Sequence, residues 1–140
     1  MECKTNILQT MRSLLNGQVL WSFDFELQNV GQEQEFRGMF SFMPPIHHHS
    51  GNIFLTPRQL IIEGDESVTV NLYDLEQLYL GYDVIYKRSY VKNGGIFWQP
   101  LRVSFSASNK SDTIYLVINY NFLGTQNHIW FQTLKQFFRE

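Results

Sequence analysis

The spacing of hydrophobic and polar residues changes twice along the chain. Over residues 5–16, apolar side chains recur three or four positions apart, as on one face of an α-helix, and Gly17 suits the left-handed position that ends a helix. Residues 19–27 alternate between apolar and polar side chains, which is typical of a half-buried β-strand. Helical spacing returns over residues 125–140, where Thr125 can cap the free N–H groups. The apolar stripe of this last segment consists of Ile129, Trp130, Leu134, Phe137 and Phe138.

The central part of the chain, residues 51–83, contains closely spaced extended segments separated by short polar turns. These segments cover residues 52–56, 59–63, 68–73 and 75–83. Pro57 fits the second position of a β-turn, because its ring fixes the backbone angle that this position needs. Strands joined by such short connections form an antiparallel meander.

The remaining extended segments flank this meander on both sides. Further strands are predicted at residues 36–42, 84–90, 96–98, 101–106 and 113–120. Pro44 and Pro45 end the first of them, because proline cannot donate to a strand ladder. Asn93-Gly94 provides the positive backbone angle of a tight hairpin between the second and third. Residues 116–118 are apolar on both faces, which favours a central position in the sheet.

The central residues, from Gly51-Asn-Ile-Phe-Leu-Thr-Pro-Arg to Asp83, resemble the core of GRAM and pleckstrin-homology-like domains. Residues 127–134 look like the C-terminal helix of that family, in which a tryptophan, here Trp130, is directed into the core. The resemblance covers residues 51–140. It implies an all-β fold with terminal helices, namely an antiparallel barrel or sandwich of about seven strands capped by a C-terminal α-helix. We expect an N-terminal helical extension over residues 1–17, followed by the domain itself over residues 18–140.

Composition narrows the classes of protein to consider. The chain has 140 residues, of which 44% are hydrophobic and 16% aromatic, so it can enclose a core. Eleven basic and 13 acidic side chains give a net charge of −2, so no overall field draws the chain to nucleic acid or to an anionic membrane, and such binding would need a local basic patch. The single cysteine, Cys3, excludes an internal disulfide framework. Without a long apolar run or a signal-peptide pattern, we expect a soluble cytoplasmic protein without a cofactor.

The resemblance implies recognition of lipids or peptides rather than catalysis, and the sequence contains no catalytic motif. The leading hypothesis is a non-enzymatic interaction module that binds a protein or peptide partner, or that self-associates as a homo-oligomer. Exposed strand edges and the N-terminal helix are the expected surfaces, because both need to be covered. Tyr79, Tyr82 and Trp98 are the candidate partner contacts.

A second hypothesis is binding of lipid headgroups at the surface of an anionic membrane. The basic residues Lys87, Arg88 and Lys92, with Arg102 on a later strand, would form the anion site. An exposed strand protected by lysine would have the same composition. The resemblance also places lipid-binding cations in the first hairpin loop, where residues 29–35 carry only acidic charges. If residues 52–63 are that hairpin instead, Arg58 stands alone.

A third hypothesis is a metal-dependent enzyme that uses His47 and His49. On an extended chain these two side chains share one face, and imidazole is a ready ligand for transition metals. A cupin site would need a glutamate shortly after the pair, whereas Ser50-Gly51-Asn52-Ile53 follows here. A polar loop with no metal explains the same run of histidines.

Overall fold

The computed structural model describes residues 14–28, 46–87, 98–107, 109–121 and 124–138. Within them the chain forms one seven-stranded sheet whose spatial order is β4-β3-β2-β1-β7-β6-β5, with every neighbouring pair antiparallel. The strands are β1 (Leu15–Phe23), β2 (His49–Leu55), β3 (Gln59–Gly64), β4 (Val68–Asn71), β5 (Leu75–Leu80), β6 (Leu101–Ala107) and β7 (Lys110–Ile118). The helices are α2 (Asp24–Leu27), the 3-10 turn η1 (Leu72–Asp74) and α4 (Asn127–Phe137).

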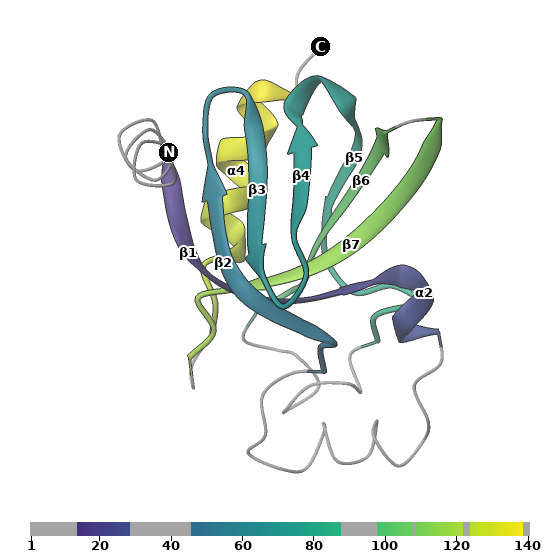
Figure 1. The fold of residues 1–140 in the computed structure, drawn as a ribbon. Coiled ribbons are helices and arrows are strands. Elements are labelled where there is room, and N and C mark those ends of the chain that lie inside the picture. The colour runs from purple at the N-terminus through teal and green to yellow at the C-terminus, as the bar shows by residue number, and fades with distance from the viewer. Residues whose placement is uncertain (1–13, 29–45, 88–97, 108, 122–123, 139–140) are drawn as a thin grey trace.

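The sheet curls into a nearly closed barrel (Figure 1). Its two end strands, β4 and β5, follow one another in sequence and are joined by η1. The C-terminal helix α4 packs against β5, β6 and β7. An all-β fold of seven strands with a C-terminal helix was expected from the sequence, and the structure confirms it for the described residues.

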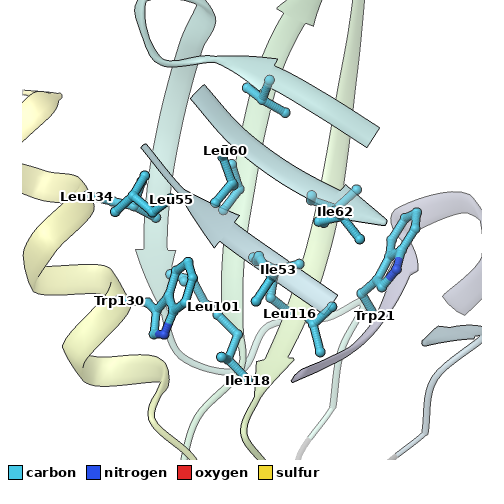
Figure 2. Close-up of a cluster of buried hydrophobic side chains, with 14 of the residues drawn as sticks. Trp21, Ile53, Leu55, Leu60, Ile62, Leu101, Leu116, Ile118, Trp130 and Leu134 are labelled. Atoms are coloured by element: carbon cyan, nitrogen blue, oxygen red, sulfur yellow. The ribbon is translucent and has the colours of Figure 1, made fainter. Parts of the chain in front are cut away.

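The core lies between the curled sheet and α4 (Figure 2). Alternate side chains of each strand point into it, for example Ile53 and Leu55 of β2. Trp130 and Leu134 point from α4 toward these strand residues, and both are almost fully buried. The expectation that Trp130 enters the core is therefore confirmed.

A second, smaller cluster lies outside the main core and consists of Leu27, Tyr86 and Tyr115. Tyr115 belongs to β7, whose neighbouring residues Ile114 and Leu116 belong to the main core instead. The strand is therefore buried on both faces at its C-terminal half, and it lies between β1 and β6. This agrees with the prediction that residues 116–118 belong to a central strand.

The strand expected over residues 19–27 is too long. β1 ends at Phe23, and residues 24–27 form the single helical turn α2. The Glu26 side chain accepts the backbone N–H of Phe23 at 2.8 Å, which stabilises this turn at its start. As a result Leu27 is buried, whereas Phe25 is 54% exposed.

The end of the helix expected over residues 5–16 is also wrong, because Leu15, Asn16 and Gly17 belong to β1. Gly17 does not end a helix. It lies opposite Ile53 in the sheet, and a Cβ atom there would come within 2.6 Å of the Asn119 side chain. Residues 1–13 lie outside the described residues, so the N-terminal helix and the boundary at residue 17 stay predictions.

The described part of the strand expected over residues 84–90 is not extended. Asp83 accepts the backbone N–H groups of Ile85 and Tyr86, and this closes a turn instead. The strand expected at 36–42 lies outside the described residues. Of the strand expected at 96–98, only Trp98 is described, and it does not belong to a strand. In α4, the predicted apolar stripe is too wide, because Ile129 and Phe137 are each 40% exposed.

Candidate functional site

One polar group of the described residues joins several segments and is centred on His49, the first residue of β2. His49 lies opposite Trp21 of β1 in the sheet. The two rings lie 4.5 Å apart between centroids, at an angle of 32°. The side chain of His49 is only 11% exposed, so its polar atoms need partners within the protein.

Both ring nitrogens of His49 have a carboxylate partner. The Nε2 atom lies 2.7 Å from Oε2 of Glu26 in α2, and Nδ1 lies 2.7 Å from Oδ2 of Asp65 in the turn after β3. Glu66 is also close, at 3.5 Å from Nε2. Burial by itself would lower the pKa of His49, but the hydrogen bonds to Asp65 and Glu26 outweigh it, so this pKa is raised above its ordinary value of 6.5. We name Glu26, His49 and Asp65 the His49 cluster.

Each carboxylate of the His49 cluster is held by a backbone N–H as well. Glu26 accepts from Phe23 through Oε1 at 2.8 Å, and Asp65 accepts from Ser50 through Oδ1 at 2.9 Å. The pKa of Asp65 is lowered, first by the hydrogen bond from His49 and then by the N–H of Ser50. Gly64 allows the turn to lie this close, because a Cβ atom there would be 2.2 Å from the Ser50 carbonyl oxygen.

The neighbouring residue His48 has the opposite environment. Its Nδ1 atom lies 2.8 Å from the hydroxyl of Ser22, and its backbone N–H donates to the same hydroxyl oxygen at 2.9 Å. Burial lowers the pKa of His48, although the charge of Glu26 acts against this. Ser22 is 1% exposed, so its hydroxyl is enclosed by the protein.

The structure gives no support to a metal site at His47 and His49. Both nitrogens of His49 are occupied by carboxylates, and on opposite sides of the ring. In the described ranges, no group of three or more His, Cys, Asp or Glu side chains is arranged to hold a metal ion.

Arg102, one of the four basic residues of the predicted anion site, makes its contacts within the protein. Arg102 of β6 donates to Asp83 at 2.8 Å and to Gln77 at 3.0 Å, and it lies over the ring of Tyr79 at 4.5 Å. Its charge is therefore balanced within the protein. Lys87 is exposed, whereas Arg88 and Lys92 lie outside the described residues.

The three candidate partner contacts lie together at one end of β5. The Tyr79 hydroxyl donates to the carbonyl oxygen of Tyr82 at 3.4 Å, and the Tyr82 hydroxyl donates to that of Trp98 at 2.9 Å. Tyr82 and Trp98 also pack against the smaller cluster, so both are partly buried. Tyr79 is the most exposed of the three, with 40% of its surface accessible.

Among the described residues, the sheet has two end strands, β5 with six residues and β4 with four. β5 pairs with β6 on one side, and no strand among the described residues pairs with its other side. Its regular part is Gln77–Leu80, which follows an irregularity between Leu75 and Gln77. Tyr73 in η1, just before β5, is 85% exposed. β4, at the other edge, has only four residues.

Comparison with protein-family models, curated proteins and solved structures found no significant match. In the described parts of the chain, no helix has the length and apolar character needed to cross a membrane.

Sequence reasoning identified His49 but not its partners. In the sequence, Glu26 falls on the polar face of an alternating segment and Asp65 falls in a polar turn, and neither position by itself indicates a partner. They meet at His49 because β1, β2 and β3 pair side by side in this register. The sequence feature that could have indicated a contact with His49 was the position of Asp65 in the turn between two strands of the meander.

Proposed function

We propose that this protein is a non-enzymatic interaction module, and that it binds an extended segment of a protein partner, or of a second copy of itself, along the outer edge of β5. The barrel-like sheet with its C-terminal helix supports the resemblance to pleckstrin-homology-like domains. The observation that carries the proposal is that, among the residues that the structure describes, β5 is an end strand of the sheet and has the exposed side chains of Tyr73 and Tyr79 beside it.

An unpaired strand edge presents rows of N–H and C=O groups that can add a further strand. β5 is better suited than β4, because it has six residues and β4 has four. Tyrosine rings near such an edge supply apolar contact at a small entropic cost and keep a hydroxyl for hydrogen bonding. Backbone pairing would give the affinity, and the rings would select among side chains of the partner.

The proposal can be tested by selecting peptides from a display library of random short sequences on the immobilised full chain. Tyr79→Lys places a flexible charge at the β5 edge, and Thr69→Lys makes the matched change at the exposed Thr69 of β4. We expect selected peptides to bind the native chain and Thr69→Lys about equally, and Tyr79→Lys at least about tenfold more weakly. Peptides that bind all three chains equally would contradict a site at β5.

Self-association is the second form of the same proposal. Sedimentation over a range of concentrations, with the same pair of variants, separates it from peptide binding. A dimer that Tyr79→Lys dissociates and Thr69→Lys leaves intact would assign the edge to a second copy. Lipid binding through Lys87, Arg88 and Lys92, and a cytoplasmic location, stay predictions.

A further inference from the structure

The His49 cluster joins three segments that are distant in the sequence. Glu26 belongs to α2, His49 begins β2, and Asp65 lies in the turn after β3. Each carboxylate uses one oxygen for the imidazole and the other for a backbone N–H, from Phe23 or from Ser50. The ring of His49 is therefore the central link in a continuous chain of hydrogen bonds from β1 to the turn after β3.

This chain of hydrogen bonds requires a particular protonation state. An ionised carboxylate only accepts hydrogen bonds, so each of the two ring nitrogens must carry a proton to be satisfied. Only the imidazolium form of histidine has both protons. When one proton leaves, one ring nitrogen becomes an acceptor that faces a carboxylate oxygen at 2.7 Å, and that contact becomes repulsive.

The groups around His49 favour its charged form. From α2 it faces Glu26, and from the turn after β3 it faces Asp65 and Glu66. β1 contributes the uncharged rings of Trp21 and Phe23. On its own strand the neighbour is His48, whose neutral form is favoured by burial.

We propose that His49, in its doubly protonated form, is a pH-sensitive clamp that holds α2 and the turn after β3 at the start of β2. Loss of one ring proton breaks one of its two carboxylate contacts and loosens the segment that contact held. This inference does not depend on the function proposed for the β5 edge.

The direction of the pH effect follows from linkage. The folded pKa of His49 lies above its ordinary value of 6.5, so its stabilising contribution is complete below pH 6.5 and is lost as the pH rises through the raised value. His48 acts in the opposite direction, because its pKa is lowered and its neutral form is the one that the fold favours. The two neighbouring histidines therefore titrate at different pH values.

The test is an NMR titration of the isotope-labelled full chain from mildly acid to mildly alkaline pH. We expect both ring nitrogens of His49 to titrate with a midpoint above 6.5, and His48 to titrate below it. The amide signals of Phe23 and Ser50 should move with the same midpoint as His49, because their acceptors are the carboxylates that His49 holds.

Three variants test whether the pH-dependent signals come from His49. Glu26→Gln removes one charge and should lower the midpoint of His49, whereas Glu76→Gln on β5 should leave it unchanged. His49→Gln should abolish the inflection at both amides, which excludes His48 as its source. A His49 midpoint at or below 6.5, or amides of Phe23 and Ser50 that do not titrate with it, would overturn the proposal.

Discussion

At the scale of single residues, one carboxylate fixes the course of the chain after β5. Asp83 accepts the backbone N–H groups of Ile85 and Tyr86, the guanidinium of Arg102 and the hydroxyl of Tyr115. Burial would raise the pKa of Asp83, but these hydrogen bonds outweigh it and the pKa is lowered. Asp83 therefore joins the segment after β5 to both β6 and β7.

Removing this carboxylate should destabilise the protein markedly. The side chains of Asp83 and Arg102 are only 17% and 21% exposed, so Asp83→Ala leaves a mostly buried cation without its partner. We expect a loss of about 3 kcal/mol in the free energy of unfolding, at the low end for a buried pair. This loss is measured by chemical denaturation.

Asp112→Ala on β7 is the control, with an expected change within about 0.5 kcal/mol. If Asp83→Ala loses no more stability than this control, the role assigned to Asp83 is wrong.

The contacts of individual polar side chains were predicted less well from the sequence than the fold. His49 and Arg102 were singled out by their type, yet their roles depend on which carboxylates the fold brings near them. The partners of His49 are 23 and 16 residues away, and that of Arg102 is 19 residues away. A local pattern contains no information on such pairs until the register of the strands is known.

At the scale of elements, the C-terminal helix closes the core through a few side chains. Trp130 and Leu134 are almost fully buried against the strands. Asn127, at the start of α4, is also buried: it accepts the N–H of Ile118 and donates to the carbonyl oxygens of Gln99 and Leu116. Buried polar groups with all their partners fix orientation, so Asn127 positions the helix that Trp130 anchors.

Replacing Trp130 by a small residue tests how much α4 contributes to the stability of the fold. Trp130→Ala should reduce the free energy of unfolding by about 3–5 kcal/mol, as large-to-small changes in a core do. Phe137→Ala removes an aromatic side chain from the same helix at a position that is 40% exposed, and it should cost clearly less. Equal losses for the two variants would show that α4 is not docked through Trp130.

The strands of the meander were easier to predict than the helical turn α2 and the start of β1. In the meander, alternation and short polar turns fixed β2, β3 and β4 to within a few residues. α2 escaped prediction because apolar alternation continues through Phe25, while the cap from Glu26 turns the backbone into a helix. The start of β1 was read as helix because Leu14 and Leu15 continue the helical spacing of the residues before them.

At the scale of the whole molecule, the ladder of hydrogen bonds between the described strands stops at two edges, β4 and β5. The sequence pattern predicted a β-rich fold, but it contains no signal for which edge of the sheet would be accessible. That depends on the strand order and on the position of α4. The proposed binding function therefore depends on whether the β5 edge pairs with a partner strand.

Amide hydrogen exchange is the most direct measurement of that edge. The native chain is compared alone and saturated with a peptide selected as described above, or as the associated form if the chain self-associates. We predict slower exchange at Gln77–Leu80 on binding and no change along β4, since an added strand protects the amides that it pairs with. Unchanged exchange at Gln77–Leu80, with protection appearing elsewhere in the molecule, would contradict the account.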